Sequence, residues 1–514
     1  MAFVFEGVLI RKNLPENVRE KLVVDTYKKR DKRTGRVDLY RRVSYYDPAK
    51  RFNVPVGSKK IGEVDLETGQ IHEILRKQSP VRKIIASGML EISDRAEKQL
   101  DDQRQQSKVI YGLPVVLDVS ILAAMGGCNG SKQFAEYWKN NRVPLQERWT
   151  FDFPKTDPAP ATFNRILQLI DPEQFQLFYQ ELVFPLLPVP NQKGVDKDII
   201  AIDGQAIRAS RTEFNRQHQM LSFYSTETGI AFCQMLIDTK SNEKPAALKL
   251  AQRLDLAGTI VTGDAMHCER KLLETLMGTS RADYCMALKM NQGKTAIEVQ
   301  DLFETYEAEA LIGSKKDRGH GRDEVRTTYV LPGYLLSTEA KKRWYGIEFG
   351  SIVKQVSQRT VRLTKAQAAM NSVVEKGGKK QEAETTTQTR YYLTSLSPEC
   401  PTIVRNVQRA IRNHWGIENG LHYVLDVDFG QDAMQAKNAN YVSNMTQLNK
   451  MALAIIELGR RRKIKTGEMA ERTAISSIIR SLQNNPRLAG EYLDIFVQES
   501  ILAAATRPQE KQVK

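Results

Sequence analysis

The chain of 514 residues is too long for one compact hydrophobic core, and its length is typical of about three domains. Its net charge of +15 and isoelectric point of about 9.4 favour a polyanionic partner, while no apolar stretch approaches the roughly 20 residues that a membrane span requires. Five cysteines without a C-x-x-C pair argue against a zinc ribbon and a disulfide framework. The first residues lack the pattern of a secretory signal, so we expect the protein to stay in the cytoplasm without membrane contact.

Residues 1–78 are expected to form a basic, β-rich domain. Short strand-like runs alternate with turn signals there, and the first 60 residues hold 16 Lys or Arg against 7 Asp or Glu. The first 60 residues therefore carry +9 of the net charge of +15. We interpret residues 1–78 as a DNA-binding domain, although a charged run can also be a solvated surface. The residues expected to contact DNA here are Lys28, Lys29, Arg30, Arg33, Arg41 and Arg42.

Residues 79–114 are expected to form a linker helix, and residues 115–192 a helical domain. Asp171 directly precedes Pro172 and a periodic apolar series, which is typical of a helix with an N-cap and a proline in its first turn. Thr162 opens another short helix. These helices could form a helix-turn-helix-like module or only a packing layer, and their spacing does not distinguish the two.

Residues 193–292 alternate between strand and helix patterns and are expected to form the first part of an α/β core. Two nearly continuous apolar runs, 198–203 and 258–264, end in Asp203 and Asp264. Such runs are typical of strands buried on both faces, and each strand would deliver a carboxylate at its end.

Residues 293–400 break this alternation and are expected to form a β-rich insertion, in which the polar stretch 374–388 is a loop without secondary structure. Apolar residues at helical spacing resume in residues 401–458, which should supply the second part of the core and a helix carrying Glu418. Residues 459–514 are expected to form a helical, basic C-terminal region.

The three acids Asp203, Asp264 and Glu418 make a candidate metal site. Hard divalent cations prefer carboxylate oxygens, and carboxylates that converge in a low-dielectric pocket repel one another unless cations neutralise them. Two cations about 3.5 to 4 Å apart can activate an attacking oxygen and stabilise a leaving oxygen in phosphodiester chemistry. Acids at strand ends are also common as caps or ion-pair partners, so the pattern alone leaves both interpretations open.

Several sequence windows resemble the H-repeat-associated family of bacterial insertion-sequence transposases. They run in order from about Val115 to Leu458, and Arg412-Asn-His-Trp-Gly-Ile-Glu-Asn419 contains the most specific string. The other windows are Ile200-Ala-Ile-Asp-Gly-Gln-Ala-Ile-Arg208, Asp264-Ala-Met-His-Cys-Glu269, Ala287-Leu-Lys-Met-Asn-Gln292, His320-Gly-Arg322 and Leu421-His-Tyr-Val-Leu-Asp-Val-Asp-Phe429.

The resemblance implies a DNA transposase with a ribonuclease-H-like catalytic core. The family's catalytic acids fall by motif position on Asp203, Asp264 and Glu418, which would bind two Mg²⁺ ions, with Mn²⁺ as a substitute. Such an enzyme would bind double-stranded DNA at the element's ends and at the target, act as a homodimer in the synaptic complex, and join freed 3′-hydroxyl ends to the target. A domesticated DNA-binding or regulatory protein and a site-specific nuclease without strand joining are the alternative functions.

Some positions depart from the family pattern. Gln205, Ala209 and Gln431 stand where the family usually has lysine, glycine and glutamate. Residues 1–78 lie outside the family pattern altogether. Short motifs in them are similar to the N-terminal segments of other insertion-sequence transposases, so we interpret these residues as an added DNA-binding module.

Other side chains on the glutamate helix and near the aspartates have candidate roles. His414, Glu418 and His422 share one helix face, which is a weak match to a zinc site because the order is not His-Glu-x-x-His. Asp426 and Asp428 could substitute as ligands, or could simply be a solvated helix end. The residues expected to contact DNA in this region, each weighed against ordinary surface charge, are Arg208, Lys289, Asn291, Gln292, Arg322, Arg326, Arg412, His414 and Trp415.

Overall fold

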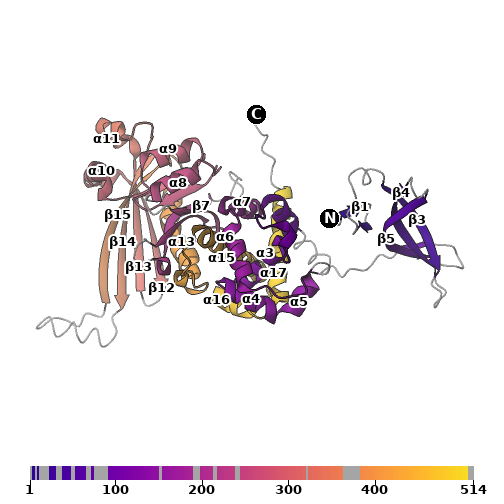
Figure 1. The fold of residues 1–514 in the computed structure, drawn as a ribbon. Helices are drawn as coiled ribbons and strands as arrows, with labels where there is room; N and C mark the ends of the chain where they lie inside the picture. Colours follow the sequence, from indigo (N-terminus) through magenta and orange to yellow (C-terminus); the bar gives the residue numbers. More distant parts are fainter. Residues whose placement is uncertain are drawn as a thin grey trace, which may run out of the picture. The chain divides into compact units, whose positions relative to one another are not determined.

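The computed structural model divides into two compact units, Met1–Lys83 and Ile84–Lys514. Figure 1 shows the ribbon of both units. The residues that the structure describes are 3–5, 8–10, 22–30, 37–47, 52–64, 71–73, 91–149, 153–188, 197–211, 217–237, 243–319, 322–362 and 383–506.

The first unit contains a four-stranded antiparallel sheet in the order β3-β4-β5-β6, and β1 pairs with β2 in a separate hairpin. The pairing of β4 with β5 shifts register after Leu39 and after Val43, which is typical of β-bulges. Among the expected DNA contacts, Lys28, Lys29 and Arg30 belong to β3, Arg41 and Arg42 belong to β4, and Arg33 lies outside the described residues. The strands are β1 (Phe3–Phe5), β2 (Val8–Ile10), β3 (Leu22–Arg30), β4 (Val37–Asp47), β5 (Phe52–Val64) and β6 (Ile71–Glu73).

The second unit is built on a nine-stranded mixed sheet (Figure 1). At its centre β10 pairs in parallel with β7 and with β11, while β7, β8 and β9 form an antiparallel meander. Every residue of β10 is buried, as expected for a parallel strand covered on both faces, and the predicted α/β class is confirmed. In spatial order the strands are β12 (Leu311–Gly319), β13 (Arg322–Pro332), β14 (Ser351–Arg362), β15 (Ala383–Thr394), β11 (Asp283–Leu288), β10 (Ile260–Gly263), β7 (Ile199–Ile207), β8 (His218–Ser225) and β9 (Ile230–Ile237).

The strands of the expected insertion extend this same sheet. β12 to β15 form an antiparallel ladder, and β15 pairs with the core strand β11, so the segment does not fold as a sheet of its own. The expectation of a loop over 374–388 is wrong for residues 383–388, which belong to β15. These residues are rich in threonine, and backbone pairing with residues 357–362 of β14, instead of burial of apolar side chains, holds them in the strand. Residues 374–382 lie outside the described residues.

Helices cover the core strands of the sheet. α8 (Glu243–Ala251) packs against β9 and against α9 (Arg270–Gly278), which also contacts β11. α10 (Gly293–Tyr306) precedes β12, and α11 (Thr338–Arg343) lies between β13 and β14. On the glutamate side, α13 (Ile403–Ile417) packs against β7 and β10.

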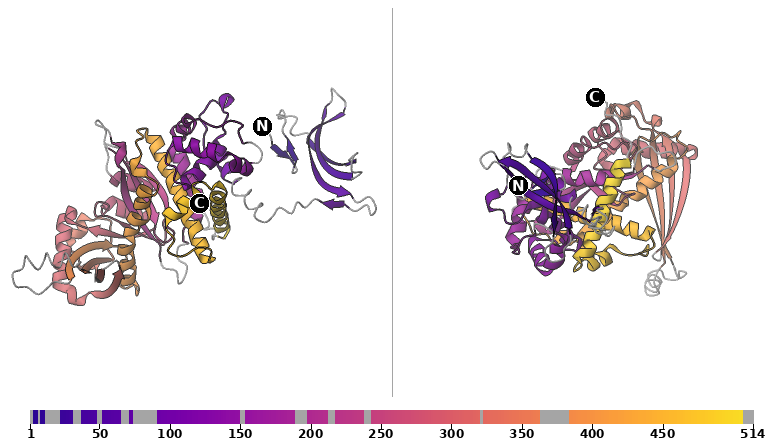
Figure 2. Two further views of the ribbon diagram at one scale, coloured as in Figure 1. Left: turned by 90° about the horizontal axis from the view of Figure 1, so that it is seen from below. Right: turned by 90° about the vertical axis from the view of Figure 1, so that its right-hand side faces the viewer.

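A bundle of helices packs against the β9 side of the sheet (Figure 2). Its central member, α15, contacts β9 as well as α3, α6, α7 and α17. The predicted N-cap is confirmed, because Asp171 Oδ1 accepts from the backbone N–H of Glu173 at 2.8 Å and of Gln174 at 3.0 Å. Residues 91–99 of the expected linker are also helical. The bundle helices are α3 (Leu113–Met125), α4 (Ser131–Asn140), α5 (Arg142–Arg148), α6 (Pro160–Leu169), α7 (Pro172–Val183), α15 (Ala439–Lys465), α16 (Ile475–Leu482) and α17 (Pro486–Thr506).

A buried ion cluster joins three helices of this bundle. Arg148, at the end of α5, lies 3.2 Å from Asp118 of α3 and 3.3 Å from Asp494 of α17, and all three side chains are almost completely buried. Trp149 Nε1 also donates to Asp118 Oδ2 at 2.8 Å. Burial raises the pKa of Asp494 to about 7. The guanidinium of Arg148 is thus the cation that balances two carboxylates inside the bundle.

Lys450 of α15 is buried beside β8 and makes the stability of the fold depend on pH. Its Nζ donates to Ser222 Oγ at 2.6 Å, and burial lowers its pKa to about 7 from the usual 10.5. Between these two values the unfolded chain holds a proton that the folded chain has lost, so the free energy of unfolding rises with pH in that window. We expect Lys450→Met to remove this rise, which urea unfolding at about pH 7 and about pH 9 would measure. An equal rise in the wild type and the variant would contradict the assignment.

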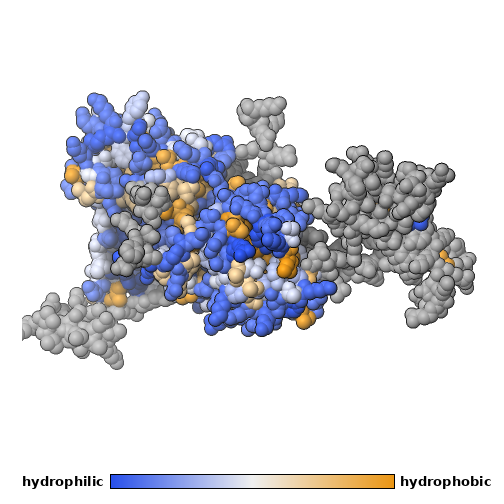
Figure 3. Space-filling view, in the orientation of Figure 1, coloured by the Kyte–Doolittle hydropathy of each residue, from blue (hydrophilic) through white to orange (hydrophobic). Residues whose placement is uncertain are grey.

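The surface of the second unit is largely hydrophilic in the view of Figure 3, with small, separate apolar patches. Among the described residues, no helix combines the length and the apolar character that crossing a membrane requires.

Candidate metal centre

Asp203 lies inside β7, and the expectation that it ends the strand is wrong. β7 continues to Ile207 because the antiparallel partner β8 pairs with it that far, whereas the parallel partner β10 ends at Gly263, opposite Ile202. Asp203 and Asp264 therefore each follow the last pair of the β7–β10 ladder. The end of the shorter strand brings the two aspartates to one edge of this ladder.

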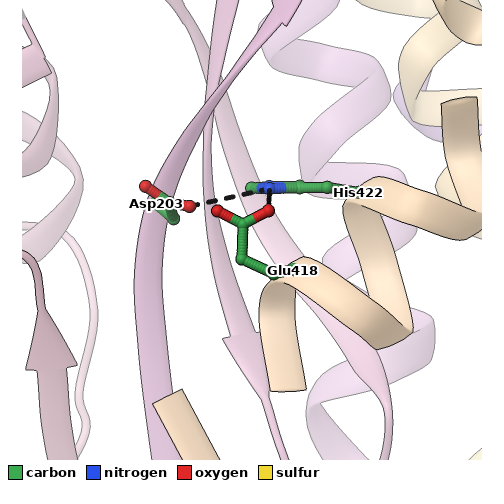
Figure 4. Close-up of side chains that lie close together, drawn as sticks. All are labelled: Asp203, Glu418 and His422. Atoms are coloured by element: carbon green, nitrogen blue, oxygen red, sulfur yellow. Dashed lines mark ion pairs between the residues drawn. The ribbon is translucent and has the colours of Figure 1, made fainter. Parts of the chain in front are cut away.

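Glu418 begins a π-helical turn within a long continuous helix. α13 runs directly into the π-helical turn (Glu418–His422), which is followed by α14 (Tyr423–Val427). Single π-helical turns inside α-helices occur frequently at functional sites. In Figure 4 the side chains of Glu418 and His422 both point from this helical segment toward Asp203 on the strand. The helix expected to carry Glu418 is thus present, with a local distortion at the glutamate.

Asp203, Glu418 and His422 form a close group of possible metal ligands (Figure 4). His422 Nδ1 lies 3.4 Å from Glu418 Oε2 and 3.6 Å from Asp203 Oδ2. One ligand atom from each residue lies within 4.8 Å of the others, and this is the one such group found among the described residues. The alternative zinc group of His414, Glu418 and His422 therefore does not form there.

The two carboxylates of this group influence each other's protonation. Burial, followed by the neighbouring Glu418 carboxylate, raises the pKa of Asp203 well above its ordinary value. The contact with the His422 imidazole lowers the pKa of Glu418. Because two facing carboxylates are costly in a partly buried site, protons or cations must offset their repulsion. The donor set and its charge fit a divalent cation.

Asp264 lines the same cavity of about 500 Å³ as Asp203 and Glu418. Its side chain is half exposed, with Lys289 Nζ 3.7 Å from Oδ2 and His414 Nε2 4.0 Å from Oδ1. The structure therefore brings the three predicted acids to one cavity, although Asp264 stands outside the close group described above.

Each aspartate has a glycine beside it, and a side chain packs against each glycine: the partly buried Glu243 against Gly204 and the buried His267 against Gly263. A Cβ at Gly204 would lie 2.3 Å from Glu243 Oε1, and a Cβ at Gly263 would lie 3.0 Å from the Cβ of His267. His267 Nε2 and Glu243 Oε2 are 3.4 Å apart, so this pair contacts the backbone next to both aspartates. Neither residue of the pair was predicted from the sequence. Its only local signal was the glycine that follows Asp203.

We expect Gly204→Ala to reduce the free energy of unfolding only modestly, by about 1 kcal/mol, because the added methyl group displaces the end of the flexible Glu243 side chain. Combining it with Glu243→Ala should recover part of the loss, which a double-mutant cycle in urea unfolding would measure. Gly278→Ala is the control, because a Cβ there meets nothing within 4 Å. Strictly additive costs of the two substitutions would argue against the contact.

Gln205 connects β7 to the segment that follows Glu418. Its Nε2 donates to Asp426 Oδ1 at 2.7 Å and to the carbonyl of His422 at 3.2 Å, and its Oε1 accepts from Gln431 Nε2 at 3.1 Å. Two positions that depart from the family pattern, Gln205 and Gln431, are thus hydrogen-bonded to each other. Asp426 is held by this network, away from the close ligand group.

The structure uses several of the expected DNA contacts within the protein. Asn291 and Gln292 donate to backbone carbonyls of the loop after β10, so they hold the loop that carries Asp264. Arg326 is 9% exposed and is paired with Glu324 and Asp317. The structure does not support Arg326 as a phosphate contact, because carboxylates already satisfy its guanidinium.

Other expected contacts lie around or near the cavity. Lys289, His414 and Trp415 line it together with the three acids, and Arg390 stacks over the Trp415 ring at 5.5 Å. Arg208 is exposed and lies 3.2 Å from a carboxylate oxygen of Asp432. The two remaining candidates, neither of which lines the cavity, are the exposed Arg412 and the half-buried Arg322.

Two family models match the chain. The model described as "DDE_Tnp_1-associated" matches residues 98–183, and the model described as "Transposase DDE domain" matches residues 194–455, which is about half of the chain. The chain belongs to the DDE transposase family. The transposase match contains all three acids of the cavity, and the associated match falls on the helices that precede the sheet.

Two of three relatives of this DDE transposase are named as putative transposases. "Putative transposase YncI" of Escherichia coli O157:H7 is 28% identical over 364 residues, which are 70% of this chain and 85% of that protein. "H repeat-associated putative transposase YhhI" of Escherichia coli (strain K12) is 27% identical over 393 residues, 74% of this chain and 95% of that protein. "Uncharacterized protein in dhlA 3'region" of Xanthobacter autotrophicus is 29% identical over 254 residues, 48% of this chain and 82% of that protein. The predicted family is therefore confirmed.

Proposed function

We propose that this DDE transposase binds the ends of a mobile DNA element, cleaves them by metal-dependent hydrolysis of a phosphodiester, and joins the freed 3′-hydroxyl ends to target DNA. The observation that carries the proposal is the meeting of Asp203, Asp264 and Glu418 at one cavity. These acids come from two strands and a distant helix. Ordinary caps and surface ion pairs do not require such a convergence.

The order of the core strands supports a ribonuclease-H-like catalytic core. β9, β8 and β7 form an antiparallel meander, and β10 and β11 continue from β7 in parallel. The segment 293–400 then stands between this core and the glutamate helix along the chain. We assign residues 193–292 and 401–458 to the two parts of the core on this basis.

The residues present fit divalent cations such as Mg²⁺ or Mn²⁺. Asp203, Asp264 and Glu418 would hold them, and the raised pKa of Asp203 is what crowded carboxylates show when protons are the only counter-charge. When bound, such ions polarise the phosphodiester and favour loss of a proton from the attacking hydroxyl or water. Asp203 is central to this arrangement, because it lies next to Glu418 and lines the cavity with Asp264.

Neighbouring side chains would orient the DNA. Lys289, with its ammonium 3.7 Å from Asp264, can contact a phosphate that approaches the cavity. His414 is held by a contact of 3.2 Å between its Nδ1 and Thr262 Oγ1, which fixes the ring beside Asp264. The exposed Trp415 offers a flat apolar surface at the rim.

The substrate would be double-stranded DNA, both at the element's ends and at the target. The net charge of +15 supports a polyanionic partner, and the basic strands β3 and β4 of the first unit are the proposed added contact. Two ends must be joined in one event, so we propose a homodimer in the synaptic complex. Its place of action would be the cytoplasm, at the nucleoid.

The test uses the full chain and a labelled duplex taken from the flanks of its coding region. With Mg²⁺ we expect strand cleavage that leaves a 3′-hydroxyl end, followed by joined products, and neither product when a chelator is present. Cleavage without joined molecules would replace the proposal by a nuclease. Tight binding without cleavage would replace it by a regulatory DNA-binding protein.

A further inference from the structure

His422 adds a nitrogen donor to a centre otherwise made of carboxylates. We propose that His422 Nδ1 is a metal ligand together with Asp203 and Glu418, and that the centre therefore takes Mn²⁺ in preference to Mg²⁺. This inference rests on the proposed metal-dependent function and deepens it by naming the cation.

The spacing of the three donors fits ligands that share one ion. His422 Nδ1 lies 3.4 Å and 3.6 Å from the nearest oxygens of Glu418 and Asp203. Both distances exceed the roughly 2.7–3.2 Å of an ordinary hydrogen bond. Donors that each lie about 2.1 Å from a shared ion are about 3.0 Å apart at right angles and farther apart at wider angles. One ligand atom from each residue lies within 4.8 Å of the others, and Figure 4 shows Glu418 and His422 directed toward Asp203.

The imidazole of His422 is held with its Nδ1 facing the carboxylates of Asp203 and Glu418. The His422 side chain is 7% exposed, and its carbonyl accepts from Gln205 Nε2 at 3.2 Å, which ties the π-helical turn to β7. Its Nε2 is buried and finds no hydrogen-bond partner among the described residues. The polar interactions of the ring are therefore concentrated at Nδ1, between the two carboxylates.

The mixture of donors selects among cations. Mg²⁺ prefers oxygen ligands, whereas imidazole nitrogen suits transition metals, and Mn²⁺ accepts carboxylate oxygens as well. Two carboxylates and one imidazole would therefore lower the free energy of bound Mn²⁺ more than that of bound Mg²⁺.

The test measures binding of the metal alone to the full chain. Electron paramagnetic resonance of Mn²⁺, with Mg²⁺ as competitor, should give an affinity about tenfold or more in favour of Mn²⁺. His422→Phe keeps the buried ring shape, and it should weaken Mn²⁺ binding about tenfold while changing Mg²⁺ binding less than about threefold. His218→Phe is the matched control, because His218 lies on β8 with its ring near the carbonyl of Lys437 and outside the ligand group.

A second measurement needs no substitution and holds even if His422→Phe does not fold. Chain labelled with ¹⁵N-histidine should show coupling of bound Mn²⁺ to an imidazole nitrogen in pulsed spectra. Mn²⁺ that depends on Asp203 but shows no nitrogen coupling would overturn the role of His422 and leave the proposed function standing. Equal binding of Mn²⁺ by the wild type and by Asp203→Asn would instead overturn the metal centre itself.

Discussion

Asp203→Asn, Asp264→Asn and Glu418→Gln should each reduce DNA cleavage about a thousandfold or more, because each removes a negatively charged ligand whose cation supplies several kcal/mol of transition-state stabilisation. The amide side chains keep the size of the acids, so binding of end DNA should stay within a few fold. Cleavage is measured with labelled end DNA under single-turnover conditions, and binding is measured by a gel-shift titration.

The matched control for these variants is Asp428→Asn. Asp428 follows α14 on the same helical segment as Glu418, but it is neither part of the close ligand group nor among the residues lining the cavity. Its removal should leave cleavage nearly unchanged. If any of the three cavity variants cut DNA as well as the Asp428 variant, that acid would not be a catalytic ligand.

Arg148→Met should lower the free energy of unfolding by about 3–5 kcal/mol, because it leaves the buried carboxylates of Asp118 and Asp494 without their cation. The effect should shrink at low pH, because the burial that raises the pKa of Asp494 to about 7 lets this acid take up a proton and lose its charge. Urea unfolding monitored by circular dichroism measures both quantities.

The chain offers an exposed pair as the control for this prediction. Arg487 of α17 pairs with Glu147 of α5, which joins the same two helices at the surface, and both side chains are more than half exposed. Arg487→Met should cost at most about 1 kcal/mol, since solvent screens such pairs. Similar losses in the two variants would mean that the buried cluster does not contribute as described.

Local patterns predicted much of the fold because they depend on neighbouring residues. The apolar run before Asp264 predicted a strand buried on both faces, and every residue of β10 is buried. Asp171 predicted the start of a helix, and its carboxylate caps the N-terminus of α7. The helical spacing of apolar residues after residue 401 predicted the helix that carries Glu418.

Features that depend on pairing between distant segments were not predictable in the same way. Whether β7 ends at Asp203 or continues to Ile207 depends on β8, which has no signal in the sequence around Asp203. The threonine-rich residues 383–388 form a strand only because β14 lies beside them. The contact of Glu243 with Gly204 likewise exists only in the folded chain.

The three acids of the candidate site were predicted, but the residues and local structure around them were not. The resemblance placed the three acids by motif position, whereas the π-helical turn that directs His422 toward Asp203 breaks the regular spacing on which the helix prediction relied. Asn291 and Gln292 were expected at the DNA, and the structure uses their amides to hold the Asp264 loop.

Iron-directed cleavage of the protein backbone tests most directly whether distant acids hold the same ions. Fe²⁺ occupies Mg²⁺ and Mn²⁺ sites, and with peroxide it generates radicals that cut the nearest peptide bonds. A metal site shared by Asp203, Asp264 and Glu418 predicts cuts close to all three, suppressed by excess Mn²⁺ and absent in Asp203→Asn. Cuts confined to other segments, or cuts near Glu418 that persist in Asp203→Asn, would contradict it.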